Sequence, residues 1–173
     1  MKNLALLALT LWFAPCVALA QDFPTAELAI GYSTINVVKG DRQTANGANG
    51  SIAFNFNRWL AAVGDLGVYS ASPSLTAITY TAGPRFSYRH WSRLTPFAQV
   101  LFGGAHASSS ASSYTGATNA YGFGAGGGTD FILDRSGRFV LRSQVEYFGF
   151  GTIGSMTDTV RVSVGLVLRI PRR

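Results

Sequence analysis

Segment after segment of this chain alternates between apolar residues and polar or small ones, and this period of two limits the fold more than any other feature. In residues 76–89 one face carries Ile78 and Tyr80. The opposite face carries Thr79 and Thr81. Because successive side chains of a β-strand point to opposite faces, the pattern predicts a strand with one apolar surface.

The same alternation recurs along the chain, bounded by clusters of Gly, Asn, Ser, Asp or Pro, and helical periodicity is absent. The predicted strands span residues 25–35, 51–57, 59–70, 76–89, 96–105, 119–132, 138–148 and 159–170. Most have roughly the ten residues that a tilted strand needs to cross a bilayer. After residue 20 no apolar run approaches the length of a transmembrane helix, so any membrane span must consist of strands.

The predicted connections fall into two classes. The connections after the odd-numbered strands are mostly longer than those after the even-numbered strands. The longer ones lie at about residues 36–47, 70–74, 106–118 and 149–158, and the shorter ones at Arg58, 90–95 and 133–137. Long loops outside and short periplasmic turns are typical of bacterial outer-membrane barrels, and an even strand number leaves both chain ends on one side. We therefore predict an all-β fold, an eight-stranded antiparallel up-and-down transmembrane β-barrel.

The first twenty residues have the pattern of a secretory signal peptide. Lys2 supplies the positive charge, residues 4–14 the apolar stretch, and Ala18-Leu19-Ala20 the cleavage signal. A membrane anchor fits less well, because the apolar run is short and Pro15 interrupts it. Cys16 is the only cysteine, and the residues before it fit a lipid-modification site poorly. We expect a signal peptide at 1–20 and the barrel at 21–173, without cysteine chemistry.

Composition and aromatic placement favour a membrane surface. Only 13% of the residues are charged, against about 25% in typical soluble domains. Membrane barrels carry aromatic girdles at both interfaces. One set of aromatic residues falls near the predicted short turns, namely Phe56, Trp59, Tyr88, Trp91, Phe131 and Phe139. A second set falls toward the predicted long loops, namely Tyr32, Tyr80, Phe102, Tyr121 and Tyr147.

A soluble barrel that carries a hydrophobic ligand, as lipocalins do, is the main alternative. Its water-facing surface would then bear Gly31, Gly67 and Gly83, where Lys and Glu would be expected. Small residues fit better inside a narrow barrel, where they leave room for long neighbouring side chains.

Three segments resemble a known family, namely Ala82-Gly83-Pro84-Arg85-Phe86-Ser87-Tyr88-Arg89, the glycine-rich residues 122–130 and residues 162–169. The chain resembles, over nearly all of 21–173, the small outer-membrane barrels of the outer-membrane protein A transmembrane-domain and opacity-protein type. The resemblance implies a non-enzymatic protein, structural or surface-interacting through four extracellular loops. Its expected partners are outer-membrane lipid, the barrel assembly machinery and a surface ligand. Such chains usually end on an aromatic residue, whereas this one ends Ile170-Pro171-Arg172-Arg173.

Several short motifs are typical of other chemistries. Residues 122–127 match the dinucleotide fingerprint GxGxxG, but a strand pattern follows where the nucleotide site needs a helix. Two histidines, without HExxH or CxxC, predict no metal or cofactor. The formal charge of +6 does not indicate nucleic acid, because most arginines map to the short-turn end, where we expect contact with lipid phosphates. These are Arg58, Arg89, Arg93, Arg135, Arg138, Arg169, Arg172 and Arg173.

One enzymatic alternative stays open. Some outer-membrane barrels deacylate lipid A with a Ser, a His and a carboxylate, and His106-Ala107-Ser108 resembles their His-x-Ser spacing. A strand places these two side chains on one face. However, no carboxylate occurs between His106 and Asp130, and Asp130 is expected at the opposite end of its strand. We expect no catalytic residues.

The inward face of the predicted strands collects charges of both signs. The cluster consists of Glu27, Asp65, Arg85, Asp130, Arg142, Glu146, Arg161 and Arg169. Eight strands enclose a lumen that side chains can fill, and buried charges persist only when paired. A final hairpin centred between residues 153 and 154 puts Glu146 opposite Arg161, and the same counting puts Asp130 diagonal to Arg142. We therefore predict a plugged lumen rather than a diffusion pore.

Overall fold

The structure is a computed structural model and describes residues 23–38, 44–72, 75–111, 114–152 and 155–171. In this part of the chain, no helix is long and apolar enough to cross a membrane. The strands are β1 (Ala26–Val37), β2 (Thr44–Asn55), β3 (Leu60–Ser72), β4 (Leu75–Ser87), β5 (Leu94–Ala111), β6 (Tyr114–Ile132), β7 (Phe139–Thr152) and β8 (Ser155–Ile170).

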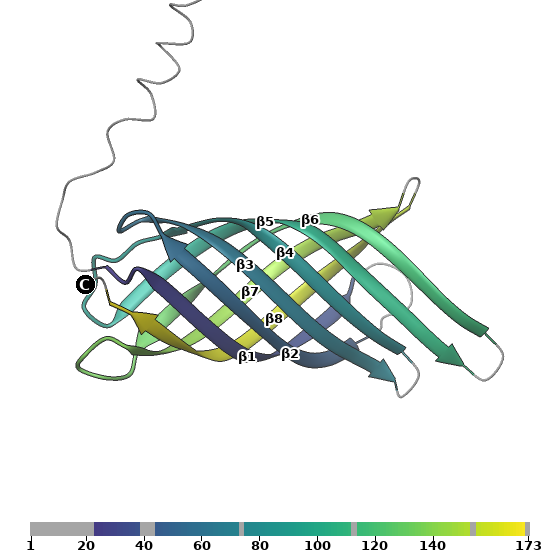
Figure 1. The fold of residues 1–173 in the computed structure, drawn as a ribbon, viewed down its shortest axis with the longest axis horizontal. Helices are drawn as coiled ribbons and strands as arrows, with labels where there is room; N and C mark the ends of the chain where they lie inside the picture. Colours follow the sequence, from purple (N-terminus) through teal and green to yellow (C-terminus); the bar gives the residue numbers. More distant parts are fainter. Residues whose placement is uncertain (1–22, 39–43, 73–74, 112–113, 153–154, 172–173) are drawn as a thin grey trace, which may run out of the picture.

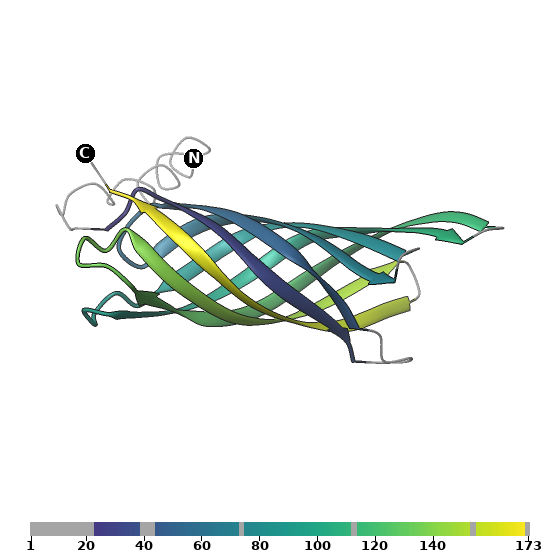
Figure 2. The ribbon, with the colours of Figure 1, turned by 90° about the horizontal axis from the view of Figure 1, so that it is seen from below.

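Each strand pairs antiparallel with the next, and β1 pairs with β8, so the sheet closes into a barrel (Figure 1). β1 begins and β8 ends at the same end of the barrel (Figure 2). We call this the terminal end; it also holds the β2–β3, β4–β5 and β6–β7 connections. The opposite end, where the other four hairpins turn, is the far end. The predicted eight-stranded antiparallel up-and-down barrel is confirmed.

The predicted long loops are wrong in their boundaries, because most of their described residues continue the strands. Residues 106–111 belong to β5 and 114–118 to β6, and the other hairpins gain residues 44–50 in β2, 149–152 in β7 and 155–158 in β8. Apart from Phe150, these stretches are rich in Ser, Thr, Ala and Gly and lack a continuous apolar face. Backbone pairing within a hairpin continues without one, so the alternation disappears before the strand ends. The β5–β6 hairpin reaches farthest at the far end (Figure 2).

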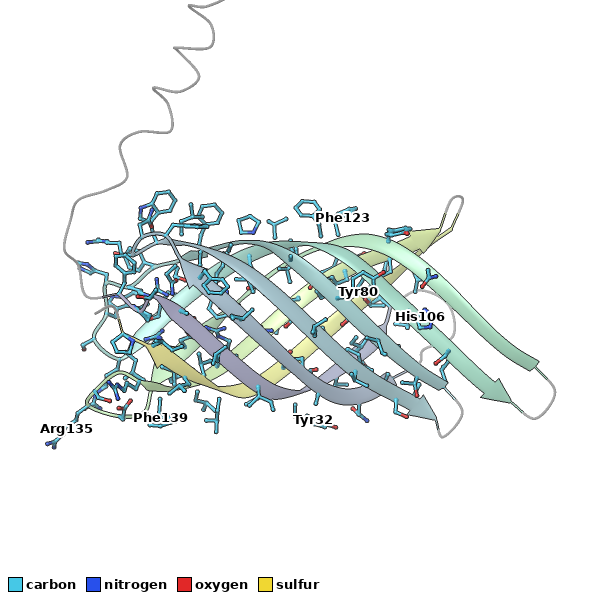
Figure 3. All side chains as sticks on the ribbon, in the orientation of Figure 1. Tyr32, Tyr80, His106, Phe123, Arg135 and Phe139 are labelled. Carbon is cyan, nitrogen blue, oxygen red and sulfur yellow. The ribbon has the colours of Figure 1, made fainter. Side chains whose placement is uncertain are left out.

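The outer surface is a band of large apolar side chains. Leu66 and Val164, both predicted to face lipid, have 63% and 51% of their surface exposed. Figure 3 shows Tyr32, Phe123 and Phe139 projecting away from the ribbon. Aromatic pairs form at the terminal end, where the Trp59 and Phe86 rings stack with 6.0 Å between their centroids, as an interfacial girdle requires.

A polar row bounds this band toward the far end. The register aligns five residues side by side across β1 to β5, namely Thr34, Asn46, Ser70, Thr76 and Ser108. Within the row, Thr34 Oγ1 donates a hydrogen bond of 2.9 Å to Asn46 Oδ1. The preceding outward row carries Tyr32, Val68 and Ile78. On β1, β3 and β4 the outer face therefore changes from apolar to polar at one level.

Glycines on the inner face make room for aromatic rings. A Cβ atom added to Gly124 would lie 2.3 Å from the ring of Phe148 on the paired strand, β7. A Cβ at Gly67 would lie 2.5 Å from the ring of Tyr69. Both distances are too short for real contacts, so a larger residue at either position would require the ring to move. The expectation that small inward residues accommodate long neighbours is confirmed here.

Candidate functional site in the barrel lumen

The structure brings all eight predicted cluster residues into the lumen. Each has at most 7% of its surface exposed. They divide into two groups along the barrel axis. The central cluster comprises Asp65, Glu146 and Arg161, and the terminal cluster comprises Glu27, Arg85, Asp130, Arg142 and Arg169, joined by Arg89.

Arg161 holds the central cluster together. Its Nε donates to Glu146 Oε2 at 2.6 Å, and its Nη1 donates to Asp65 Oδ1 at 2.6 Å. Glu146 and Arg161 are direct partners in the β7–β8 register, which confirms the pair predicted from the hairpin centre. The Arg161 guanidinium also lies 5.0 Å from the centre of the Phe148 ring. One cation thus serves two buried carboxylates and one aromatic face.

Two carboxylates organise the terminal cluster. Glu27 accepts hydrogen bonds from Arg89 at 2.7 Å and Arg142 at 2.8 Å. Arg85 and Arg169 approach the same carboxylate at 3.6 Å. Asp130 receives two parallel bonds from Arg142, at 2.7 and 2.8 Å. Asp130 also accepts a bond of 3.0 Å from Arg169. Bidentate charge-assisted bonds of this kind are the stronger ones in proteins.

Two sequence expectations about this cluster are corrected. Asp130 lies directly opposite Arg142, not diagonal to it. The β6–β7 connection is centred on Ser136, one residue beyond the middle of the predicted turn, and Gly137 closes it with a φ of 69°. Arg89 was expected at the lipid phosphates but reaches into the lumen mouth. It donates there to Glu27 and Asn55 and to the backbone oxygen of Arg58, because Glu27 is a buried anion within reach of a long side chain.

Uncharged residues that sequence reasoning missed connect the two clusters. Gln99 accepts a hydrogen bond from Arg85 at 2.7 Å and donates one to Glu146 at 2.6 Å. The Phe97 ring lies between two guanidinium groups, with Arg85 at 4.6 Å and Arg142 at 4.9 Å from its centre. The alternation does place Gln99 and Phe97 on the inward face. They were missed because only charged residues were selected from that face.

The space left between these side chains is small. A cavity lined by Asn49, Arg142, Gln144 and Ser163 measures about 10 Å³. That volume is close to the minimum that holds one water molecule. Toward the far end, Leu101, Phe148 and Phe150 pack together, and the two phenylalanine rings stack at 5.3 Å. Charged and apolar side chains therefore fill successive levels of the lumen.

The remaining candidate motifs lie on β5 and β6. His106 Nδ1 lies 2.7 Å from Asn119 Oδ1, an amide rather than a carboxylate, and Asp130 lies toward the other end of β6. The glycine motif at residues 122–127 lies inside β6, where no helix follows it. Among the residues that the structure describes, no group of three or more His, Cys, Asp or Glu side chains is arranged to hold a metal ion.

Four of the arginines expected at the short turns, Arg58, Arg93, Arg135 and Arg138, are exposed. Figure 3 shows Arg135 at the terminal end. Arg169 belongs instead to the terminal cluster. Arg172, Arg173 and the signal peptide predicted at residues 1–20 lie outside the described residues.

Comparison with known proteins supports the fold. No family model matches the chain, and no curated protein sequence matches it. Among solved structures, Neisserial surface protein A aligns with a TM-score of 0.68 at 12% identity, over 84% of this chain and 96% of that chain. Ail, the attachment invasion locus protein of Yersinia pestis, aligns with a TM-score of 0.62 at 18% identity, over 84% of this chain and 97% of that chain.

The outer membrane protein OprG of Pseudomonas aeruginosa aligns with a TM-score of 0.54 at 10% identity, covering 87% of this chain and 95% of that chain. At these identities the likeness concerns the fold alone. It supports the closed eight-stranded barrel fold that the sequence predicts.

Proposed function

We propose that this chain is a bacterial outer-membrane β-barrel that performs no enzymatic reaction and acts as a structural or surface-interacting protein. The observation that carries the proposal is the apolar outer band around a lumen filled by ion pairs. Exposing so many large apolar side chains to water is unfavourable, whereas lipid solvates them. The charged interior is buried and paired, as the inside of a small membrane barrel requires.

The same observation disfavours a soluble carrier of hydrophobic ligands. Such a carrier turns its apolar side chains inward around a cavity. Here the large apolar residues face outward, and the middle of the lumen holds Arg161, Glu146 and Asp65. A buried arginine paired with two carboxylates leaves no apolar surface for a ligand at that level.

Surface contact would occur through the four hairpins at the far end. Beyond the polar row, β5 and β6 extend as a paired ladder to Ala111 and Tyr114. Hydroxyl and amide groups dominate this region, as in the hydrogen bond of 2.8 Å from Thr44 Oγ1 to Asn36 Oδ1. Ail, which shares the fold, has been solved in complex with the heparin analogue sucrose octasulfate. We propose that the hairpin ends of this chain likewise meet external partners.

Fractionation of cells that produce the full chain tests the location. We expect the protein in the outer-membrane fraction after a high-salt wash, with Gln21 at its N-terminus if the signal peptide is cleaved as predicted. We also expect folded and boiled samples to migrate differently on a gel. Recovery in the soluble periplasmic fraction, with identical migration before and after boiling, would contradict the proposal in favour of the soluble carrier.

Assembly is the second part of the proposal. We propose that the barrel assembly machinery inserts this chain into the outer membrane. Depletion of that machinery should reduce the heat-modifiable form of the protein. An unchanged amount of that form after depletion would contradict this part alone and leave the membrane location standing.

A further inference from the structure

The terminal end of the barrel holds a cavity that the proposed function does not use. It measures about 750 Å³, within the usual range for small-molecule sites, and its lining includes Phe23, Arg89, Trp91, Thr95, Arg138 and Arg169. These residues come from the segment before β1, the β4–β5 connection, the start of β5, the β6–β7 connection and the end of β8. The cavity is therefore built by the closure of the barrel rather than by one loop.

The charges around this cavity do not balance. Among the residues that the structure describes, Arg85, Arg89, Arg142 and Arg169 of the terminal cluster face two carboxylates, those of Glu27 and Asp130. The central cluster has the opposite excess, but the cavity opens on the cationic side, and exposed Arg138 adds a further positive charge to its wall. Buried cations in excess of their partners favour an additional anion.

Two arginines at the terminal cavity, Arg89 and Arg169, also have hydrogen-bond donors that are not fully satisfied. The side chains of Arg89 and Arg169 are 11% and 8% exposed. Among the described residues, the buried Nε atom of Arg89 has no hydrogen-bond acceptor, and that of Arg169 has only the Glu27 carboxylate at 3.6 Å, beyond hydrogen-bond distance. Both side chains line the cavity. The terminal end therefore combines a cavity of this size with two guanidinium groups and an excess of positive charge.

We propose that this terminal cavity is a binding site for a phosphate group, held by Arg89 and Arg169 with Arg138 at its rim. A phosphate group carries between one and two negative charges near neutral pH, and this charge is opposite in sign to the excess in the terminal cluster. Its oxygens fit the planar donor fork of arginine. The proposal concerns the end of the barrel opposite to the hairpins and does not rest on surface binding.

The test is calorimetric titration of inorganic phosphate into the folded full-length barrel, in an uncharged, phosphate-free detergent. We expect saturable binding with one site per barrel. Arg89→Gln should weaken it at least about tenfold, because a charge-assisted contact is lost. Arg138→Gln, at an exposed position outside the ion-pair clusters, should weaken it less. Arg93→Gln and Arg135→Gln are matched controls, because both arginines are exposed near the same end and do not line the cavity.

The heat-modifiable gel shift of each variant shows whether the barrel is folded, so loss of folding is distinguished from loss of binding. Absence of saturable binding to the folded wild-type protein would overturn the proposal. Equal weakening by the control substitutions would also overturn it, since a diffuse positive charge would then explain the binding. Asp22 precedes Phe23 in the sequence. If only the Asp22→Asn variant binds phosphate, the chain's own carboxylate occupies the site and the proposal fails.

The phosphate group could belong to a soluble ligand or to a lipid headgroup, and a second experiment distinguishes these two sources. Barrels in zwitterionic detergent micelles are titrated with glycerol phosphate and, separately, with a short-chain phosphatidylglycerol. Binding of both, weakened by Arg89→Gln, indicates a site that accepts lipid headgroups. Binding of glycerol phosphate alone indicates a soluble ligand. Each result supports the site, and binding of neither overturns it.

Discussion

At the scale of single residues, Arg161 is the side chain on which the middle of the lumen depends. It is almost fully buried, and it pairs with Glu146 and Asp65 from two other strands. Removing a charged group from water is costly, so a buried ion pair adds little net stability compared with an apolar core. Removing one partner is different, because the remaining charges stay buried without a counterion.

We therefore expect Arg161→Ala to destabilise the folded barrel by about 3–5 kcal/mol, because it leaves two carboxylates without their cation. Glu146→Gln should cost less, since Asp65 still pairs with Arg161. The Arg161→Ala, Glu146→Gln double variant should be more stable than the sum of the single losses predicts. Urea unfolding in lipid vesicles measures the four free energies of unfolding, and additive losses would rule out the coupled pair.

Leu66 and Val164 test the outer face. Arginine near the middle of a bilayer costs roughly 2–4 kcal/mol on the lipid side of a barrel, and both side chains lie in the apolar band. We expect Leu66→Arg and Val164→Arg to lower the free energy of unfolding by that amount, or to prevent insertion. Asn46→Arg is the control, because its exposed side chain lies in the polar row. Equal effects at all three positions would contradict the assigned band.

At the scale of elements, β6 shows how a strand without an apolar inner face still packs. Its inward positions include Gly122, Gly124 and Gly126, beside β7, which carries Phe148 and Phe150. Glycine weakens an isolated strand, since it has no side chain to pack. In this barrel the missing side chains leave the volume that the rings of β7 occupy.

Gly124→Ala should consequently destabilise the barrel, because the new methyl group overlaps the Phe148 ring. Gly64→Ala provides the control, since its Cβ meets nothing closer than a methyl group of Ile52 at 3.8 Å. Combining Gly124→Ala with Phe148→Ala should restore part of the loss, as seen by urea unfolding. A Gly124→Ala variant as stable as Gly64→Ala would show that the ring does not constrain β6.

The β6–β7 connection is held by one carboxylate. Asp134 accepts hydrogen bonds from the Ser136 hydroxyl and from the backbone N–H of Phe139 at 2.8 Å, and these bonds lower the pKa of Asp134 below 3.8. A lowered folded-state pKa means that the stabilisation is present above pH 3.8 and is lost as the pH falls through the folded-state value. We expect amide-exchange protection of Phe139 to decrease over that range. The Asp134→Asn variant should lack this pH-dependent loss of protection. An identical pH profile in both proteins would show that the Asp134 carboxylate does not cause it.

At the scale of the whole molecule, closure of the barrel produces the plug. Strands β3, β7 and β8 contribute the three members of the central cluster, and Gln99 of β5 connects it to the terminal cluster. No two adjacent strands alone assemble this network. The lumen is therefore sealed only when β1 meets β8 and the sheet is complete.

We expect purified barrels in a planar bilayer to show no large, steady conductance. Substituting Arg161, Glu146 and Asp65 together with alanine should admit water into the lumen and produce measurable current, provided that the heat-modifiable gel shift shows folding. Steady conductance by the wild-type barrel would contradict the plug, whereas a silent, folded triple variant would show that the remaining side chains seal the lumen without this cluster.

Alternation in the sequence by itself determined the strand number and the lipid-facing and inward-facing residues. A period of two depends only on neighbouring residues, so it is visible before the chain folds. The inward position of Glu27 and Arg161 follows from it directly. The pairing of Glu146 with Arg161 needed one further assumption, a hairpin centred between residues 153 and 154, and the register of β7 and β8 agrees with it.

Tertiary structure alone decided which charges meet across the lumen. Glu27 of β1 binds Arg142 of β7, and Arg161 of β8 binds Asp65 of β3, between strands that are not hydrogen-bonded neighbours. Those contacts depend on the diameter and stagger of the closed barrel, which no local pattern encodes. The inward turn of Arg89 has the same origin, because only barrel closure brings the Glu27 carboxylate within its reach.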